Sequence, residues 1–478
     1  MDPDSPSPPK SPGSSSAGDS FEKGVKKYWA WILAVIICYF IFSNSLQYAL
    51  IRGILSLFGV ILLGWIAWKL WVHYIQQDFI SGIEFVLLEI VPPRDVLRSP
   101  QAMELFITNA LYHFSYKGGK EEWWQGAVWF WFSLEIASID GQVHFYIRTP
   151  SRIRGLIETQ MYAQYPQAQV KAVEDYTLAV DEITAKSAWN AWGCEFCLLK
   201  PEAYPIRTYI DYALDEDPKE EYKVDPISPI IELFGSIHKG EQMWMQIVVT
   251  PSRKMYHTKG TWFGKHDWVA ESRFVLLKLL QPFTNTRANV LTGKQGLEVR
   301  APKWMDPRIK RVGDKTGKLG FESGVRVMYL AKKEIYPPGT RTNNSRDIRL
   351  IFRQFQNPDS NGFDRINSAQ GDRYSGIFPA SKKTVMMLAN RMLHEYRERA
   401  FFHLPLRHHI FSQNHWDWPI PGIIGIDGII KAYVHHKTFV LNTEELATLW
   451  HFPGQILKVP TLERIESKEA SPPPNLPT

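Results

Sequence analysis

Two long apolar stretches lie next to each other near the N-terminus, and they limit what this chain can fold into. The first covers Tyr28 to Leu50, and the second runs from Ile54 to Val72. Each is long enough for a helix, at about 1.5 Å per residue, to cross a hydrocarbon core about 30 Å thick. Because lipid offers the backbone no hydrogen-bond partners, helices are the form in which such stretches span a bilayer. The sequence therefore predicts a two-helix transmembrane hairpin over residues 28–73.

The flanking charges and tryptophans predict the orientation of this hairpin. Lys23, Lys26 and Lys27 precede the first stretch, Lys69 lies near the end of the second, and only Arg52 occupies the expected turn. Basic residues favour the cytoplasmic side, and tryptophans favour the membrane interface. The expected interface anchors are Trp29, Trp31, Trp65, Trp68 and Trp71. We therefore expect a protein of the cytoplasmic (inner) membrane whose N-terminus and soluble part lie in the cytoplasm.

Two other interpretations of these stretches are less favoured. A signal peptide followed by one helix fits poorly, because the polar N-terminal tail is long and contains no clear small-residue cleavage site. A buried hairpin in the core of a soluble protein fits poorly as well, because neither stretch has a polar face.

The rest of the chain, out of 478 residues that are 45% hydrophobic, is long enough for two or three domains with their own cores. Residues 1–27 are predicted to be a disordered tail, and residues 454–478 form a Pro-rich C-terminal tail. A net charge of +6 is too small to imply nucleic-acid binding by itself.

The three cysteines predict no disulfide framework. Cys38 lies in the first apolar stretch, whereas Cys194 and Cys197 lie on an expected strand, where their spacing places them on opposite faces. Buried strand cysteines are favoured over a zinc or redox site, because no second cysteine pair lies nearby.

Residues 83–176 carry the signals of a β-α-β-β-α-β module. We expect strands over 83–91, 127–139, 142–149 and 169–173, and helices that begin at Ser99 and Ser151. Ser99 before Pro100 is typical of a helix start, and Asp140-Gly141 is typical of a hairpin turn. This order of elements predicts a ferredoxin-like arrangement. Aromatic residues on both faces of the second strand favour helices on one side and a neighbouring domain or the membrane surface on the other, over an aromatic ligand platform.

Residues 190–453 repeat this order less regularly. The expected strands are 192–199, 243–250, 324–332 and a closing strand at 437–441, with helices at 226–237 and 345–356. Two insertions interrupt the module, at 251–320 and 357–436, and each contains a helix, Trp268–Leu280 and Ser381 to about Phe401. The predicted fold class is therefore α+β, with the transmembrane hairpin followed by two ferredoxin-like modules.

Motifs for catalysis are absent from the sequence. The Gly-Lys pairs lack the following Ser or Thr and the upstream Gly of a phosphate-binding loop, and neither a His-Glu-x-x-His pattern nor a Gly-x-Ser-x-Gly elbow is present. Late histidines are concentrated at His394, His403, His408, His409, His415, His435 and His436. An exposed basic loop is favoured over a metal site there. We expect no enzyme activity, no cofactor and no metal, with an enzyme built on this histidine-rich segment as a remaining alternative.

Basic residues in the first insertion are the candidate contacts to an anionic partner. They are Arg308, Lys310, Arg311 and Lys315. Such residues can bind nucleic-acid phosphates or lipid headgroups, although a solvated face is the more common explanation.

The C-terminal stretch FVLNTEELATLWHFP, residues 439–453, predicts a short helix capped by Asn442 and Glu445, with Leu446, Leu449 and Phe452 packed inward. This stretch resembles one in type IV secretion and conjugation ATPases, including HerA-like motors, of candidate-phylum bacteria. The resemblance extends to LLEIVPPRDVLRSPQAMELF, FSLEIASIDGQVHFYIRTP, MYAQYPQAQVKAVEDY, VRVMYLAKKE and LERIESKEASPPPNLP.

In those longer proteins a membrane anchor and an uncharacterised domain precede the ATPase, which begins shortly after a Pro-rich segment similar to 472–477. The resemblance implies the membrane-anchored, non-catalytic half of a secretion motor, without the ATPase domain. We therefore expect an accessory or docking component that binds the bilayer and a separately encoded ATPase, with self-association left open. A general membrane scaffold or nucleic-acid-binding adaptor is the alternative.

Overall fold

The computed structural model describes residues 45–93, 98–113, 119–216, 224–252, 256–257, 265–266, 268–281, 284–288, 295–299, 306–336, 348, 350–366, 368, 382–399, 401–402 and 438–454. The chain divides into two compact units, residues 1–73 and residues 74–478. Each unit is described by itself below.

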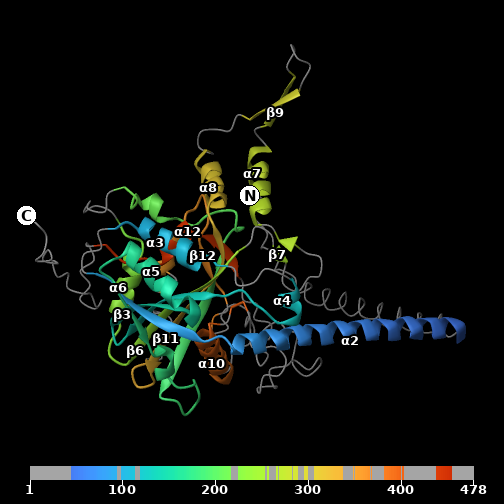
Figure 1. The fold of residues 1–478 in the computed structure, drawn as a ribbon, viewed down its shortest axis with the longest axis horizontal. Helices are drawn as coiled ribbons and strands as arrows, with labels where there is room; N and C mark the ends of the chain where they lie inside the picture. The colour runs from blue at the N-terminus through green and yellow to red at the C-terminus, as the bar shows by residue number, and fades with distance from the viewer. Residues whose placement is uncertain are drawn as a thin grey trace, which may run out of the picture. The chain divides into compact units, whose positions relative to one another are not determined.

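Helix α2 (Ser45–Ser81) begins in the first unit and is the long helix of Figure 1. Within the described part of the chain, Ile51–Ser81 is the one helical stretch long and apolar enough to cross a membrane, and none of its most apolar window is buried. Its exposed apolar side chains include Ile54, Leu55, Leu57, Phe58, Val60, Ile61 and Leu63.

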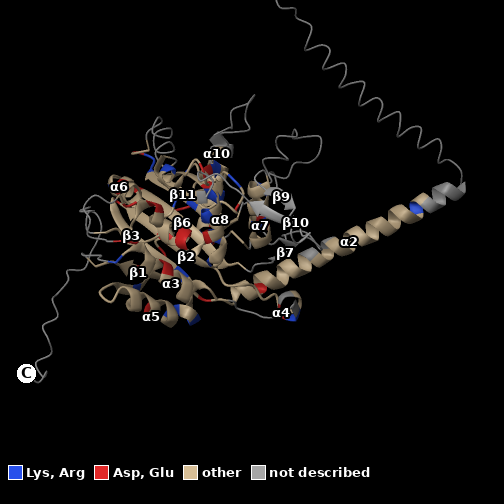
Figure 2. Ribbon diagram, turned by 90° about the horizontal axis from the view of Figure 1, so that it is seen from above, with Lys and Arg blue, Asp and Glu red and all other residues tan. Residues whose placement is uncertain are grey.

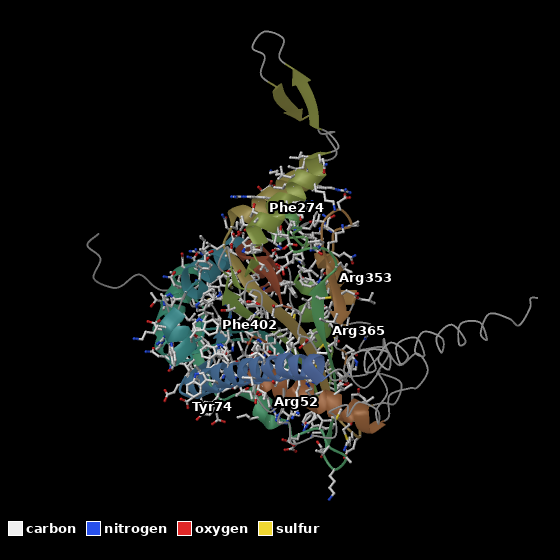
Figure 3. All side chains as sticks on the ribbon, turned by 90° about the vertical axis from the view of Figure 1, so that its right-hand side faces the viewer. Arg52, Tyr74, Phe274, Arg353, Arg365 and Phe402 are labelled. Atoms are coloured by element: carbon white, nitrogen blue, oxygen red, sulfur yellow. The ribbon has the colours of Figure 1, made fainter. Side chains whose placement is uncertain are left out.

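The expected turn at Arg52 is wrong, because Arg52 lies inside helix α2, as Figure 3 labels it. Ser45 to Leu50, which we assigned to the first span, belong to this same helix. The helical periodicity continues through Arg52 and Gly53 because one charge and one glycine do not break an otherwise apolar helix. The remainder of the first apolar stretch, with Trp29 and Trp31, lies outside the described residues.

The second unit is mixed helix and sheet, which confirms the α+β class. Its sheet contains β1 (Phe85–Val91), β2 (Phe132–Ile139), β3 (Gln142–Pro150), β4 (Gln169–Val173), β5 (Trp189–Leu198), β6 (Glu241–Pro251), β11 (Gly320–Lys332), β12 (Phe363–Ile366) and β13 (Phe439–Asn442). The strand order is β12-β5-β11-β6-β2-β3-β1-β4, and neighbouring strands are antiparallel. Strand β13 pairs off this path with the start of β11.

The two halves of the sheet have the same internal order. The first half has the order β2-β3-β1-β4, and the second half has the order β6-β11-β5-β12. In both, the strand that comes second in the sequence is followed across the sheet by the third, the first and the fourth. The halves join where β2 pairs with β6. The expected closing strand at 437–441 does not take the fourth place. The short strand β12, from within the expected insertion 357–436, pairs with β5 instead, whereas β13 pairs with β11.

One face of the sheet is covered by helices whose apolar side chains form the main core. They are α3 (Pro100–Phe106), the π-helical turn η1 (Ile107–Leu111), α5 (Arg154–Gln164), α6 (Ser228–Gly235), the 3-10 turn η6 (Phe352–Phe355) and α12 (Thr443–Leu449). Local sequence signals define several of these elements. Ser99 Oγ accepts a hydrogen bond from the Gln101 N–H, and Asn442 and Glu445 form the expected capping box. Asp140 and Gly141 have positive φ angles in the β2–β3 hairpin.

The opposite face is covered by α10 (Lys382–Glu398), which comes from the second insertion. Ala389, Met392, Leu393 and Tyr396 of α10 pack on a second core that includes Trp244 and Met328. The first insertion contributes α7 (Trp268–Leu280), with the expected bounds, and α8 (Asp306–Gly317). Its short strands are β7 (Tyr256–His257), β8 (Lys265–His266), β9 (Thr284–Ala288) and β10 (Gln295–Val299).

The last two turns of α2 belong to the second unit and pack against its sheet. Phe79 and Ile80 contact a cluster formed by Val128, Trp131 and other buried side chains. Strand β2 begins at Phe132 rather than at residue 127. The turn before it approaches α2 closely at Gly126, whose φ is +68° and where a Cβ would lie 2.2 Å from the carbonyl oxygen of Ile75.

This contact predicts that Gly126→Ala destabilises the protein. The left-handed backbone conformation and the overlap with a backbone oxygen together should cost about 3 kcal/mol of unfolding free energy. Gly155→Ala in α5 is the matched control, because a Cβ there meets nothing within 4 Å, and it should be neutral or stabilising by up to about 1 kcal/mol. Denaturation followed by tryptophan fluorescence measures both changes. Equal stability of the two variants would contradict the close approach.

Candidate functional site: a buried row of charges beneath helix α10

Polar side chains form a row across the middle of the sheet on the face that α10 covers. The strand register places Glu195 of β5 opposite Arg326 of β11, Arg326 opposite Gln246 of β6, and Gln246 opposite Glu135 of β2. Residues opposite one another on antiparallel strands point to the same face. All four side chains are buried, so this row lies inside the protein rather than on its surface.

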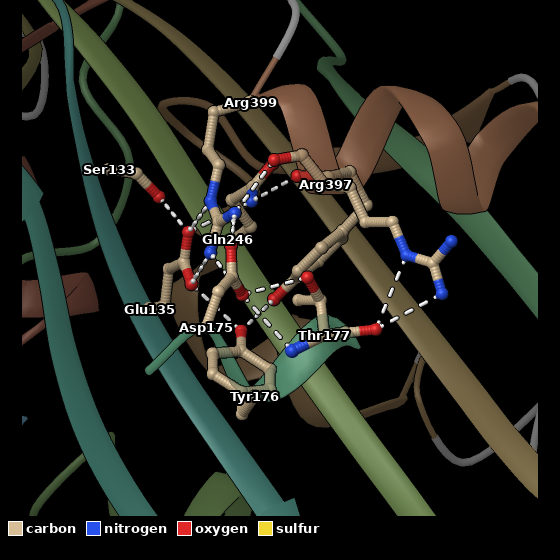
Figure 4. Close-up of polar contacts among 9 residues, drawn as sticks. Ser133, Glu135, Asp175, Tyr176, Thr177, Gln246, Arg397 and Arg399 are labelled. Atoms are coloured by element: carbon tan, nitrogen blue, oxygen red, sulfur yellow. Dashed lines mark hydrogen bonds and ion pairs between the residues drawn. The ribbon is translucent and has the colours of Figure 1, made fainter. Parts of the chain in front are cut away.

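Arg399, which directly follows α10, joins this row from the insertion. Its Nε donates to Glu135 Oε1 at 2.9 Å and its Nη2 to Glu135 Oε2 at 3.2 Å. The same guanidinium forms an ion pair with Asp175 (Figure 4). Arg399 has a positive φ of 51°, a conformation that costs a non-glycine residue free energy. The two carboxylates it reaches compensate for that conformation.

Glu135 accepts hydrogen bonds from side chains on several elements. Tyr176 donates to Oε2 at 2.8 Å, and Gln246 donates to Oε1 at 3.0 Å. Ser133 also donates to Oε1, and the hydroxyls of Tyr176 and Tyr396 are hydrogen bonded at 2.9 Å. Counting the two bonds from Arg399, Glu135 accepts five side-chain hydrogen bonds through its two oxygens. These donors stabilise its carboxylate in the interior.

The electrostatics of the cluster favour the charged forms of Asp175 and Arg399. Burial alone would raise the pKa of Asp175, but the nearby Arg399 guanidinium and its hydrogen bonds lower that pKa below the usual value. Burial alone would lower the pKa of Arg399, but Glu135 and Asp175 raise it well above the usual value. Burial and the charge of Glu135 raise the pKa values of Tyr176 and Tyr396. These shifts move the pKa of each group further from neutral pH. The groups therefore keep one protonation state near pH 7, which suits a structural role.

A second buried ion pair continues the row. Arg326 Nη2 lies 2.9 Å from Glu195 Oε1, and the Arg326 guanidinium stacks 4.3 Å from the ring centroid of Phe401. Two glycines on the sheet leave room for α10 and Phe401. A Cβ at Gly324 would lie 2.3 Å from the Phe401 ring, and a Cβ at Gly193 would lie 2.4 Å from Met392 Sδ. Glycine on the central strands therefore lets α10 and Phe401 pack closely on the sheet.

The basic residues of α8 are mostly engaged within the protein. Lys315 is a buried residue whose Nζ lies 2.9 Å from Glu445, so it is not the surface contact that we expected. Arg311 Nη2 lies 2.6 Å from Asp211 Oδ1, and Arg308 forms an ion pair with Asp359. Lys310 is exposed. The sequence could not reveal these pairings, because each partner comes from a distant segment.

A further bridge fastens α8 to the helical face of the sheet. Nζ of Lys318, just after α8, lies 2.8 Å from Glu104 Oε1 of α3 and 2.9 Å from Glu444 Oε2 of α12. In Figure 2 the acidic and basic residues of the second unit are interspersed along the coloured ribbon.

The other expected site residues are placed as follows. Trp65 and Trp71 are exposed on α2, and Trp68 is half-buried. Cys194 is buried and Cys197 is half-buried. His394 lies 3.2 Å from Glu182, whereas the histidines from His403 to His436 lie outside the described residues. Among the side chains that the structure describes, no group of three or more His, Cys, Asp or Glu could hold a metal ion.

Comparison with known proteins assigns no family to the chain. No protein-family model matches the chain, and no curated protein matches it.

The Glu135–Arg399 contact predicts a large and non-additive effect on stability. Arg399→Met leaves a buried carboxylate without its cation and should lower the unfolding free energy by about 3–5 kcal/mol. Adding Glu135→Gln to Arg399→Met should recover part of that loss, because the double variant buries no unpaired charge there. Denaturant titration of the single and double variants measures the coupling.

Arg154→Ala is the matched control for this cycle. Arg154 forms an ion pair with Glu158 at 2.6 Å, but its side chain is 45% exposed, so its loss should change stability by well under about 1 kcal/mol. If the Arg399 and Arg154 variants were equally stable, the buried row would not be what holds α10.

Proposed function

We propose that this protein is a membrane-anchored, non-catalytic docking component of a type IV secretion-like system that works with a separately encoded ATPase. Its anchor would be a two-helix hairpin that includes α2, in the cytoplasmic membrane. Its N-terminus and its second unit would face the cytoplasm. The resemblance of the sequence to the membrane-anchored part of secretion ATPases supports this proposal.

The exposed apolar surface of α2 is the observation that carries the proposal. Leu55, Leu57 and Ile61 are more than 60% exposed, and side chains of this kind are favourably removed from water when a partner or a lipid covers them. A bilayer covers a helix on all sides, which suits a stretch that has exposed apolar residues around its whole circumference.

We further propose that the second unit consists of two ferredoxin-like modules joined edge to edge. The strand orders β2-β3-β1-β4 and β6-β11-β5-β12 support this interpretation, because both have the order of a split β-α-β arrangement. Helices lie on one face of both halves, and α10 crosses the other face. Such a body offers fixed outer surfaces for a partner.

The ion pairs favour docking over the nucleic-acid alternative. Arg308, Arg311 and Lys315 each have an acidic partner within the chain. A nucleic acid would have to compete with these partners, and with Lys315 it would have to unpack a buried contact.

Membrane insertion of α2 predicts protection of its side chains from water-soluble reagents. Leu57→Cys should be protected from a maleimide-polyethylene glycol reagent in membrane vesicles and should become reactive after detergent is added. Phe274→Cys on α7 is the matched control, because Phe274 is 65% exposed and Leu57 is 62% exposed. Phe274→Cys should react in inverted vesicles and be protected in intact spheroplasts. Leu57→Cys that reacts without detergent would contradict the anchor.

Docking predicts that an ATPase co-purifies with the protein from detergent-solubilised membranes. The ATPase should remain bound to wild-type protein and to Arg154→Ala, and it should be lost from Arg399→Met if the docking surface depends on an ordered α10. Mass spectrometry of the bound proteins identifies the partner. Recovery of no ATPase above the level in untagged membranes would contradict the docking function.

A further inference from the structure

The short helix α4 (Gly119–Trp124) exposes two neighbouring tryptophans. Trp123 is 43% exposed and Trp124 is 65% exposed. Other tryptophans of the same unit are buried, among them Trp131, Trp244 and Trp450. Tryptophan gains more than most side chains when it leaves water, so an adjacent pair at the surface indicates an interaction site.

Helix α4 is held beside the part of α2 that belongs to the second unit. The N–H groups of Gln125 and Ala127 donate to the Glu121 carbonyl at 3.1 and 3.0 Å, which closes the turn after α4. Gly126, in that turn, lies so close to Ile75 that a Cβ would overlap its carbonyl oxygen. Figures 1 and 2 both show α4 against this end of α2.

The residues that precede this contact along α2 are those of the apolar stretch. Tyr74, next to Ile75, is 62% exposed, and the apolar stretch ends at Val72. Tyrosine and tryptophan are the side chains that prefer the headgroup layer of a bilayer, because each combines an apolar ring with a polar group. Helix α4 therefore holds two such side chains near the point where the chain changes from an apolar helix to a folded body.

We propose that α4 is a second membrane contact, in which Trp123 and Trp124 enter the headgroup layer of the bilayer that α2 spans. This inference rests on the proposed membrane anchor and adds a partner surface to it. The only basic residue of α4 is Lys120, and Glu121 and Glu122 offset its charge. The indoles rather than a net positive charge carry the interaction, so zwitterionic phosphatidylcholine is sufficient as the partner and salt has little effect on the contact.

A second attachment changes what the anchor does. One helix lets a body rotate and tilt about the point where the helix ends. A contact at α4, fixed to the sheet through Val128 and Trp131, sets one orientation of the second unit above the membrane. A partner then meets the same face of this unit in every copy.

A fluorescent probe next to the tryptophans tests this contact in the full-length protein. Gln125→Cys, an exposed position beside Trp124, is labelled with a nitrobenzoxadiazole dye after reconstitution into phosphatidylcholine vesicles. Lipids that carry a nitroxide near the headgroup should quench this dye strongly. They should not quench the dye at Phe274→Cys, the control of equal exposure to Trp124. Replacing both tryptophans by serine in the Gln125→Cys protein should reduce the quenching several-fold.

A dye at Leu57→Cys separates this inference from the membrane anchor itself. Quenching at Leu57 by nitroxides placed deep in the lipid chains, without quenching at Gln125, would overturn the second contact and leave a protein partner or another copy of this chain as the occupant of α4. Quenching at Gln125 and Phe274 to the same extent would overturn it as well. Absence of quenching at Leu57 would overturn the anchor, and the inference with it.

Discussion

The ion pair between Glu135 and Arg399 is the contact on which the arrangement of the second unit depends. These residues are 264 positions apart in the chain and both are buried. A carboxylate at the centre of a wide sheet cannot stay charged beneath a helix without a counter-charge. Arg399 supplies that charge from the end of α10, and it reaches Asp175 at the same time. The long insertion is therefore needed to complete the core of the sheet.

The effect of this cluster extends to the end of α2. Phe401 follows Arg399 by two residues, stacks on Arg326, and packs in the cluster that receives Phe79 and Ile80. The same cluster contains Val128 and Trp131, which lead back to the turn at Gly126. Contacts thus run without a gap from the buried charges to the last turns of α2. A change in how α10 lies on the sheet would alter the surface against which those turns pack.

Local chemistry made part of this fold predictable from the sequence. The cap at Ser99, the turn at Asp140-Gly141, and the reciprocal cap of Asn442 and Glu445 involve neighbours in the chain, so residue order was sufficient to identify them. The helix Trp268–Leu280 has its expected bounds because its periodicity is its own. The strands expected at 83–91, 142–149 and 169–173 correspond to β1, β3 and β4.

Long-range partners set the limits of that prediction. Polar residues on an antiparallel strand usually face solvent, so Glu135, Gln246 and Arg326 gave no sign that α10 would cover them. Strand β12 has only four residues, too few for a clear strand pattern, and it lies in the segment 357–436 that we predicted to be an insertion. Lys315 belonged to a basic run, and only its distant partner Glu445 makes it a core residue.

Charges under α10 also specify its position in a way that apolar packing alone would not. An apolar helix can shift by one turn, about 5.4 Å, along an apolar face and lose few contacts. The same shift here would separate Arg399 from Glu135 and Asp175 and leave buried charges without partners, which is far more costly than a lost methyl contact. The glycines at 193 and 324 add a steric restriction, because the indentations they leave match Met392 and Phe401. A body that must present one surface to a partner benefits from a helix that has a single allowed position.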